Sequence, residues 1–353
     1  MNLILRAFEI LAAVALVVGV IVFLFGGTKW RSRVSQIAFA VCAAIVLLSL
    51  VTILYFVGSH SFQTFTDQHI TLGQFFTGKV WNPDNGQVGA VIPIVGTLTV
   101  TLLAVLISTP VSVALAVFVT EIAPTWARQF MQPVLELFAG IPSIVYGLLG
   151  IELIVPLVRY AYNYLVGAFL YAGFGVVAAG LVLSLMILPT ITSISIDAIG
   201  SLPAGLREAS LALGATRWQT IRRTLIPAGS SGIFTGVILG TGRAIGETLA
   251  VAFLVGSNPG SFPIQFTNSF PYFVLYPTST ITVQIFQDFK EATPGSLDFD
   301  AVWTLAFVLL LLSLLLVIAS RYVASRSAFK ATNATRPRGA AKIAATTLPA
   351  TTV

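Results

Sequence analysis

The feature that most constrains this chain is a series of apolar runs long enough to cross a membrane. A helix rises about 1.5 Å per residue, so roughly 20 apolar residues cross the ~30 Å hydrocarbon core of a bilayer. Of the 353 residues, 56% are hydrophobic and 9% are charged, and the mean hydropathy is +0.93. Seven runs are predicted to span the membrane, at residues 8–26, 34–57, 93–119, 133–156, 174–196, 230–256 and 301–320.

These runs predict an all-α integral membrane protein. Backbone groups inside lipid must bond within the protein, and the sequence lacks the regularly spaced alternating strands of a membrane barrel. The single cysteine, Cys42, lies in an apolar run and is interpreted as a small buried residue. His60 and His69 have no Cys or carboxylate neighbours at metal-ligand spacing, so we expect neither a metal site nor a cofactor.

The distribution of Lys and Arg predicts the orientation, because short loops rich in these residues stay in the cytoplasm. If residues 29–33 ("KWRSR") are cytoplasmic and the spans alternate, fourteen cations lie inside and four lie outside. The four outer cations are Arg6, Lys79, Arg159 and Lys290. The opposite orientation would invert this ratio and is rejected.

The two ends of the chain are less constrained than its middle. Residues 8–26 resemble a signal peptide because a basic residue, Arg6, precedes an apolar core. However, no A-x-A cleavage site is evident, and cleavage would leave "KWRSR" outside, against the charge rule. We therefore expect residues 1–57 to hold two spans, with the N-terminus outside. The segment 324–353 is rich in Ala, Thr, Arg and Lys without an apolar period, and is predicted to be a disordered cytoplasmic tail near anionic lipid.

The segment "GLREASLALGATRWQTIRRTLIP", residues 205–227, concentrates charge in the predicted cytoplasmic loop 197–229. Leu206, Ala209 and Leu213 recur at helical spacing, and Gly214 is placed to end that helix in a left-handed conformation. Thr216 with Gln219 forms a capping-box pattern that opens a second helix. That helix is expected to carry an apolar stripe of Trp218, Ile221 and Leu225, and to end at Pro227.

Three functions fit such a segment. It resembles an amphipathic loop on the membrane surface, a DNA-reading helix-turn-helix, or a projection that docks into a partner protein. DNA reading is disfavoured because both ends are held within a few residues of membrane spans, so no nucleic-acid partner is expected.

Specific residues favour docking. Glu208, Ala209, Ser210 and Gly214, followed by Ile226-Pro227, resemble the EAA loop of ABC importer permeases, with Thr224 in place of the first isoleucine of the family pattern. In that family the loop inserts into a separate ATP-binding subunit, which implies coupling roles for Glu208, Ala209, Gly214, Trp218 and Arg222. "GQFFTGKV", residues 73–80, lacks the Ser or Thr of a phosphate-binding loop and is predicted to lie outside, so this chain is not expected to be an ATPase.

A charged pair marks the predicted span 230–256. Arg243 and Glu247 are four residues apart and are expected on one helix face. Ionised groups at this depth are costly and face a partner or an aqueous path. The pair is either a structural link between helices or part of an anion pathway, in which the guanidinium fork suits phosphate oxygens.

Three motifs extend the resemblance over residues 91–323. "AGIPSIVYGLLG" (139–150), "ILPTITSISIDAI" (187–199) and "GRAIGETLAV" (242–251) are similar to the C-type (PstC) permease subunit of phosphate ABC importers. That family implies a type I importer fold with six core spans, so the run at 8–26 is an extra helix. It implies transport of phosphate, with Arg243 and Glu247 in its path. Another oxyanion, sulfate or molybdate, is the alternative substrate.

The resemblance also implies the partners and the division of the chain. The partners are an A-type permease, two copies of an ATPase, an external phosphate-binding protein and membrane lipid. The divisions are the two N-terminal spans (1–57), an external loop (58–92), the permease core (93–323) with an external loop at 257–300, and the tail (324–353). Pro142 is expected to break its span, where Ser143 is a candidate substrate contact. The loop 257–300 is net acidic and is expected to meet the binding protein.

The predicted orientation has a direct test. Single cysteines introduced at Asn2 and Thr352 in a Cys42→Ala background should behave oppositely toward a membrane-impermeant thiol reagent in intact cells. Asn2→Cys should react at once, and Thr352→Cys only after the membrane is opened. An Asn2→Cys variant that reacts only in opened cells would overturn the extra crossing at 8–26.

Overall fold

The computed structural model describes residues 28–66, 69–166, 173–256, 277–290 and 292–335. The chain divides into two compact units, Met1–Phe62 and Gln63–Val353. Within the described residues, six helices are long and apolar enough to span a membrane. These candidate spans are Ser35–Thr66, Val91–Ile122, Ser143–Tyr164, Val176–Gly200, Arg217–Gly246 and Leu297–Tyr322. Each overlaps one predicted span, and the seventh prediction, at 8–26, lies outside the described residues.

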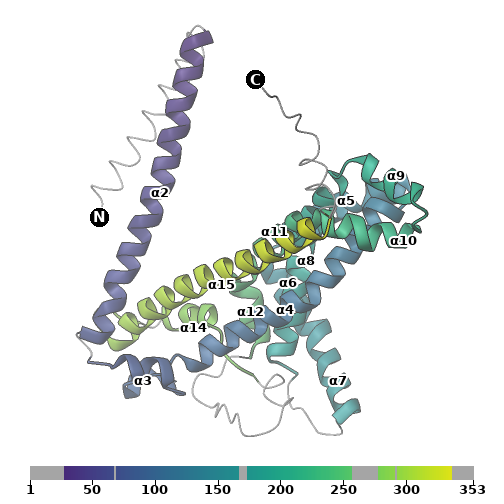
Figure 1. Cartoon of the computed structure of the whole chain (residues 1–353). Coiled ribbons are helices and arrows are strands. Elements are labelled where there is room, and N and C mark those ends of the chain that lie inside the picture. The colour runs from purple at the N-terminus through teal and green to yellow at the C-terminus, as the bar shows by residue number, and fades with distance from the viewer. Residues whose placement is uncertain (1–27, 67–68, 167–172, 257–276, 291, 336–353) are drawn as a thin grey trace, which may run out of the picture. The chain divides into compact units, whose positions relative to one another are not determined.

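Nearly all of the regular structure is helical (Figure 1). The first unit contains most of α2 (Thr28–Thr66). The elements that follow are α3 (Leu72–Thr77), β1 (Trp81–Asn82), η1 (Pro83–Asn85), β2 (Gln87–Val88), α4 (Val91–Val117), η2 (Phe118–Ile122), α5 (Thr125–Gly140), α6 (Ser143–Leu149), η3 (Gly150–Ile154), α7 (Val155–Val166), α8 (Val176–Gly200), α9 (Ala204–Ala212), α10 (Arg217–Thr220), η4 (Ile221–Leu225), α11 (Ile226–Gly246), α12 (Leu249–Leu254), α14 (Ile281–Asp288) and α15 (Leu297–Thr335). The segments η2, η3 and η4 are single π-helical turns.

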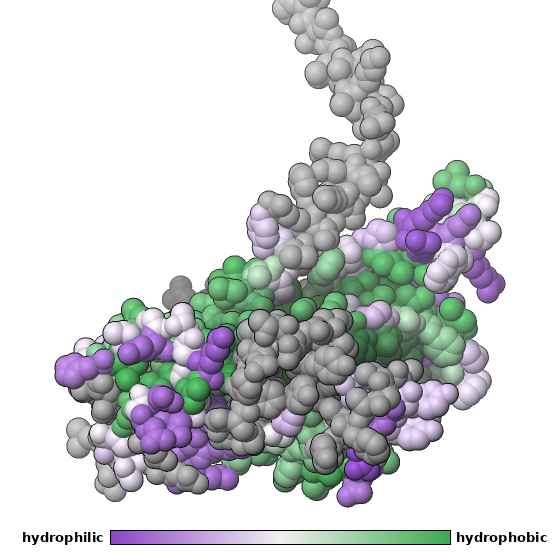
Figure 2. Space-filling model, turned by 90° about the horizontal axis from the view of Figure 1, so that it is seen from below, coloured by the Kyte–Doolittle hydropathy of each residue, from purple (hydrophilic) through white to green (hydrophobic). Residues whose placement is uncertain are grey.

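Helix α8 is the centre of the second unit. It packs most extensively against α4 and α11, and α11 in turn packs against α15. Leu183, Met186 and Ile187 of α8 are almost completely buried in the main apolar cluster. The close approach of α11 to α8 depends on small residues, because a Cβ atom added at Gly240 of α11 would lie 2.7 Å from the side chain of Ile191 of α8. Figure 2 shows apolar residues over the middle of the visible face, with hydrophilic residues gathered toward its ends.

Two spans contain a break in the helix. The chain is extended at Ile141 and Pro142, so the predicted break at Pro142 is confirmed. The predicted span 133–156 is therefore wrong in its bounds, because residues before the break form the separate amphipathic helix α5 and the span continues from Ser143 to Tyr164. The predicted span 230–256 is likewise interrupted after Gly246 and begins earlier, at Arg217.

Residues 69–90, which we call the hairpin cap, are folded rather than forming a simple loop. A capping box at Thr71 and Gln74 opens α3, and the short strands β1 and β2 pair antiparallel. Phe75, Trp81 and Val88 are buried in one cluster with residues of α14 and α15. The predicted external loop 58–92 is thus wrong at its start, since α2 continues to Thr66, and contains regular structure at its end.

The predicted loop 257–300 and the predicted tail are also shorter than expected. Residues 257–276 lie outside the described part, but α14 forms within the loop and α15 begins at Leu297. Two acidic residues of this loop contact the fold rather than project into solvent: Asp300 is 4% exposed, and Asp288 accepts a hydrogen bond from Trp81 at 2.6 Å. The tail is helical to Thr335, because no proline interrupts the helix before Pro337.

Helix α14 is held against α4 by a close backbone contact that gives a stability prediction. A Cβ atom at Gly96 would collide with the carbonyl oxygen of Ser279, next to the hydrogen bond from the Ile281 amide to Thr97 Oγ1 (2.9 Å). Gly96→Ala should destabilise the protein by about 1–3 kcal/mol, as overpacking does.

The matched control is Gly73→Ala in α3, where an added Cβ meets nothing within 4 Å. Thermal unfolding of both variants in detergent checks this difference. Equal melting temperatures for Gly96→Ala and Gly73→Ala would show that the α4–α14 contact is not tightly packed.

Candidate functional site

The predicted cytoplasmic loop 197–229, which we call the coupling loop after its expected role, has the predicted local structure around Gly214 and Thr216. Gly214 has φ +81° and ends the first helix in the left-handed region. Thr216 Oγ1 accepts from the Gln219 amide at 3.3 Å, and Gln219 Oε1 accepts from the Thr216 amide at 2.9 Å, so the predicted capping box is confirmed. Two short helices therefore meet at a glycine turn, at the end of the second unit opposite α3 (Figure 1).

The second helix of the loop does not end at Pro227, contrary to the sequence prediction. It continues through the π-helical turn η4 into α11, and Pro227 occupies the first turn of α11. A proline there needs no amide hydrogen bond, and the wider turn before it relieves the clash of its ring with the preceding carbonyl. The loop is consequently a direct extension of a membrane-spanning helix.

The residues assigned to ATPase coupling form a surface that this chain leaves uncovered. No residue of α9 is buried, and Glu208, Ala209, Gly214 and Arg222 are exposed. Leu213 is 89% exposed and Trp218 is 62% exposed. The predicted stripe of the second helix is correct only in part, since Ile221 and Leu225 are buried against their own chain while Trp218 is not.

The predicted pair of Arg243 and Glu247 does not share a helix face. Helix α11 ends at Gly246, and Glu247 has an extended backbone with φ −74° and ψ 126°. Because glycine at 246 favours the end of a helix, the four-residue spacing no longer brings the two side chains together. Arg243 is half-buried, and its Nη1 donates instead to Thr190 Oγ1 of α8 at 3.3 Å. Among the described residues Arg243 forms no ion pair.

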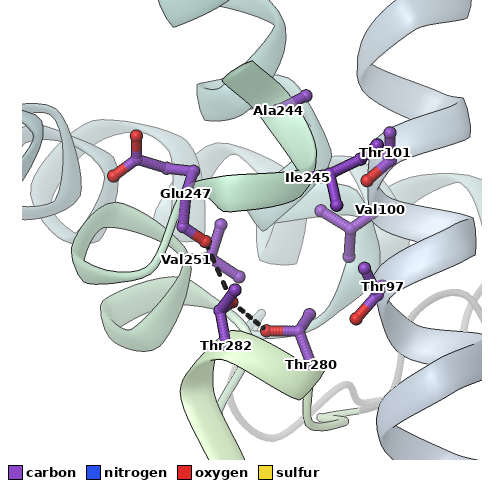
Figure 3. A pocket seen from close by; sticks show the side chains of 9 residues that line it. All are labelled: Thr97, Val100, Thr101, Ala244, Ile245, Glu247, Val251, Thr280 and Thr282. Atoms are coloured by element: carbon purple, nitrogen blue, oxygen red, sulfur yellow. Dashed lines mark hydrogen bonds between the residues drawn. The ribbon is translucent and has the colours of Figure 1, made fainter. Parts of the chain in front are cut away.

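Glu247 lies at a small pocket beside the break between α11 and α12 (Figure 3). Its backbone carbonyl accepts from Thr282 Oγ1 at 3.0 Å, and Thr282 is linked to Thr280 by a 3.1 Å hydroxyl contact. The Glu247 carboxylate points away from these threonines (Figure 3). The enclosed volume is about 10 Å³, which is room for about one water molecule, so the pocket is closed to an ion as large as phosphate.

Ser143 is the first residue of α6, directly after the break at Pro142. It is half-buried, and its hydroxyl has no hydrogen-bond partner among the described residues. Tyr146, one turn later, donates to the Phe138 carbonyl at 2.8 Å and so bridges the break.

Two contacts at the site were missed by the sequence analysis. Arg207, in α9, forms an ion pair of 2.7 Å with Glu121 at the end of α4. Thr190, which lies within the motif 187–199, accepts a hydrogen bond from Arg243. The partners are 86 and 53 residues apart in sequence, so no local spacing indicated either contact.

Comparison with known proteins identifies the family. Residues 108–328 match the model of the binding-protein-dependent transport system inner membrane component. The chain belongs to this family. It is a multi-pass permease of the cytoplasmic membrane and a component of a transport system.

The permease has close relatives among curated proteins. It is 41% identical over 287 residues to a probable ABC transporter permease protein, YqgH, of Bacillus subtilis, covering 81% of this chain and 88% of the relative. It is 34% identical to the phosphate transport system permease protein PstC of Pasteurella multocida, covering 82% and 89%. The PstC 1 protein of Mycobacterium tuberculosis is 35% identical, with coverage of 71% and 81%.

Solved structures give weaker similarity. A bacterial ABC transporter involved in the import of alginate aligns with a TM-score of 0.49 and 17% identity, covering 84% of this permease and 98% of that chain. An inward-facing methionine transporter, MetNI, aligns with a TM-score of 0.47 and 19% identity, covering 70% of this permease and 96% of that chain.

Proposed function

We propose that this permease is the C-type transmembrane subunit of an ATP-driven importer of inorganic phosphate. The relatives named PstC, which align over most of the chain, support phosphate as the substrate. Within the structure, the proposal is carried by Arg243, a half-buried cation in a membrane helix whose only hydrogen-bond partner among the described residues is the neutral hydroxyl of Thr190. A charge in this position is costly unless it meets an ion of opposite sign.

The surroundings of Arg243 support a path for an anion. A Cβ atom added at Gly242 or Gly246 would meet nothing within 4 Å, so the helix next to Arg243 faces open space in this subunit. A guanidinium presents a fork of donors that matches phosphate oxygens. Ser143 directly follows the break at Pro142, and its half-buried hydroxyl, which has no hydrogen-bond partner among the described residues, would be available to the anion. Glu247, at the end of the same helix, would reduce the attraction of the site so that the anion also leaves.

The other subunits follow from surfaces that this chain leaves uncovered. We assign the open side of α11 to the A-type permease, which would complete the path as a heterodimer. The exposed face of α9 and Trp218 would dock into the ATPase, present in two copies in the importer. The external phosphate-binding protein would approach from the opposite end, and the apolar outer faces of the spans would contact lipid.

The proposed role of Arg243 predicts a loss of uptake without loss of assembly. Arg243→Gln should abolish phosphate uptake, and Arg243→Lys should reduce it roughly tenfold, because an ammonium lacks the planar fork of donors. Glu247→Gln should alter uptake while Arg243 is retained. Phosphate uptake is measured beside the yield of the purified complex, with Arg159→Gln as the control, since Arg159 is an exposed arginine of another span.

A structural pair would behave differently. If Arg243 and Glu247 served only to link helices, each single change would lower the complex yield, and the double change to Gln at both positions would restore it. Recovery of both yield and uptake in the double variant would overturn the assignment of Arg243 to phosphate.

The docking of the coupling loop is tested at Gly214. A side chain in the left-handed region costs about 1–2 kcal/mol, and Asn tolerates it better than other residues. Gly214→Glu should abolish stimulation of the ATPase in reconstituted vesicles, Gly214→Asn should retain most of it, and Glu208→Ala should weaken it. Normal stimulation in both Gly214→Glu and Glu208→Ala would exclude this loop as the docking element.

A further inference from the structure

Helix α9 is attached to the rest of its own chain by very little apolar surface. None of its residues is buried, and Leu206, Leu211 and Leu213 are all exposed. One hydroxyl contact, from Ser210 to Thr220 at 2.9 Å, links α9 to the helix that follows. A helix this short is marginal by itself and needs tertiary contacts to hold its position. Its attachment to the membrane spans must therefore come mainly from polar contacts.

Arg207 supplies those contacts. Its Nε donates to both carboxylate oxygens of Glu121, at 3.0 and 3.2 Å, and its Nη2 donates to Oε1 at 2.7 Å. The remaining donors bind two backbone carbonyls, with Nη1 at 3.0 Å from Leu202 and Nη2 at 3.2 Å from Ile199. One guanidinium thus joins three parts of the chain: α9, the end of α4 and the end of α8.

The surroundings make this contact stronger than an ordinary surface ion pair. The side chains of Arg207 and Glu121 are 26% and 13% exposed, so solvent screens them only partly. The carbonyl of Ile199 lies in the last turn of α8 and that of Leu202 just beyond it, where the helix dipole favours a cation. The hydrogen bond to Glu121 raises the pKa of Arg207 above its ordinary value, so the guanidinium stays charged.

The elements joined by Arg207 are those that form the core of the permease. Glu121 lies in the π-helical turn η2, which continues α4, and α4 packs along α8 over the greatest length of any helix pair. A displacement of α9 would pull on the ends of α4 and α8 together. A flexible attachment would allow the loop to move while the spans remained still.

We infer that Arg207 is a positioning residue that transmits movement of the coupling loop to α4 through Glu121 and to α8 through the carbonyl of Ile199. This rests on the proposed function, because it assumes that α9 docks into the ATPase. It assigns a role beyond docking: Glu208 and its neighbours would contact the partner, while Arg207, on the side that faces this chain, would link that contact to the membrane. Lysine would not replace it, since one ammonium cannot serve four acceptors in a planar arrangement.

The experiment separates linkage from docking by comparing two activities of the reconstituted importer. Arg207→Lys, Arg207→Gln and Glu121→Gln should assemble and hydrolyse ATP, but the phosphate moved per ATP hydrolysed should fall roughly tenfold, the scale of losing charge-assisted hydrogen bonds. Arg128→Gln is the matched control, because Arg128 is an exposed arginine of α5 without an ion pair among the described residues. It should keep the wild-type ratio.

A double-mutant comparison tests whether the two residues act together. Arg207→Gln combined with Glu121→Gln should lose no more than Arg207→Gln alone, because Glu121→Gln removes only a link that Arg207→Gln has already broken. A wild-type ratio of phosphate to ATP in Arg207→Gln, or losses that add in the double variant, would overturn the inference. If Arg207→Gln assembles poorly, Arg207→Lys keeps the charge and allows the ratio to be measured.

The experiments also distinguish a failure of the linkage through Arg207 from a failure of the proposed function. If Arg207→Gln keeps the wild-type ratio of phosphate to ATP while Gly214→Glu loses stimulation of the ATPase, only the linkage through Arg207 is overturned. Normal stimulation in Gly214→Glu would instead remove the docking loop on which the linkage depends.

Discussion

Hydrocarbon offers the backbone no hydrogen-bonding partner, and the rest of this structure depends on that constraint. Every span is helical, and a break in a span has to be compensated by other groups. The break at Pro142 is bridged by the Tyr146 hydroxyl, which donates to the Phe138 carbonyl. The break after Gly246 is compensated by Thr282, which donates to the carbonyl of Glu247. Ser143 and Glu247, both proposed to handle phosphate, directly follow these two breaks.

The charged residues of the core divide into two groups with different environments. Arg207 and Glu121 satisfy each other at the end of the spans, so their charges stabilise the chain itself. Arg243 lies deeper and has only Thr190 as a partner among the described residues. A paired charge suits a mechanical link, whereas an incompletely satisfied charge suits a site that binds and releases an anion. Arg207 therefore fits a role in ATP-driven movement, and Arg243 fits a role in the passage of substrate.

The coupling loop is connected to the membrane helices both by the continuous backbone and by polar contacts. Its second helix continues through η4 and Pro227 into α11, which carries Arg243. Its first helix is tied by Arg207 to α4 and α8. Movement of the loop would thus reach Arg243 from two directions, along α11 and through Thr190 of α8.

The sequence by itself determined the features set by local physics: the number and order of the described spans, the capping box at Thr216, the left-handed turn at Gly214 and the break at Pro142. Each depends on residues within a few positions of one another. Only the tertiary structure decided which charges meet. Glu121 and Arg207 are 86 residues apart, and Arg243 pairs with Thr190 rather than Glu247. Such contacts depend on how α4, α8 and α11 pack, and helical spacing carries no information about packing between distant segments.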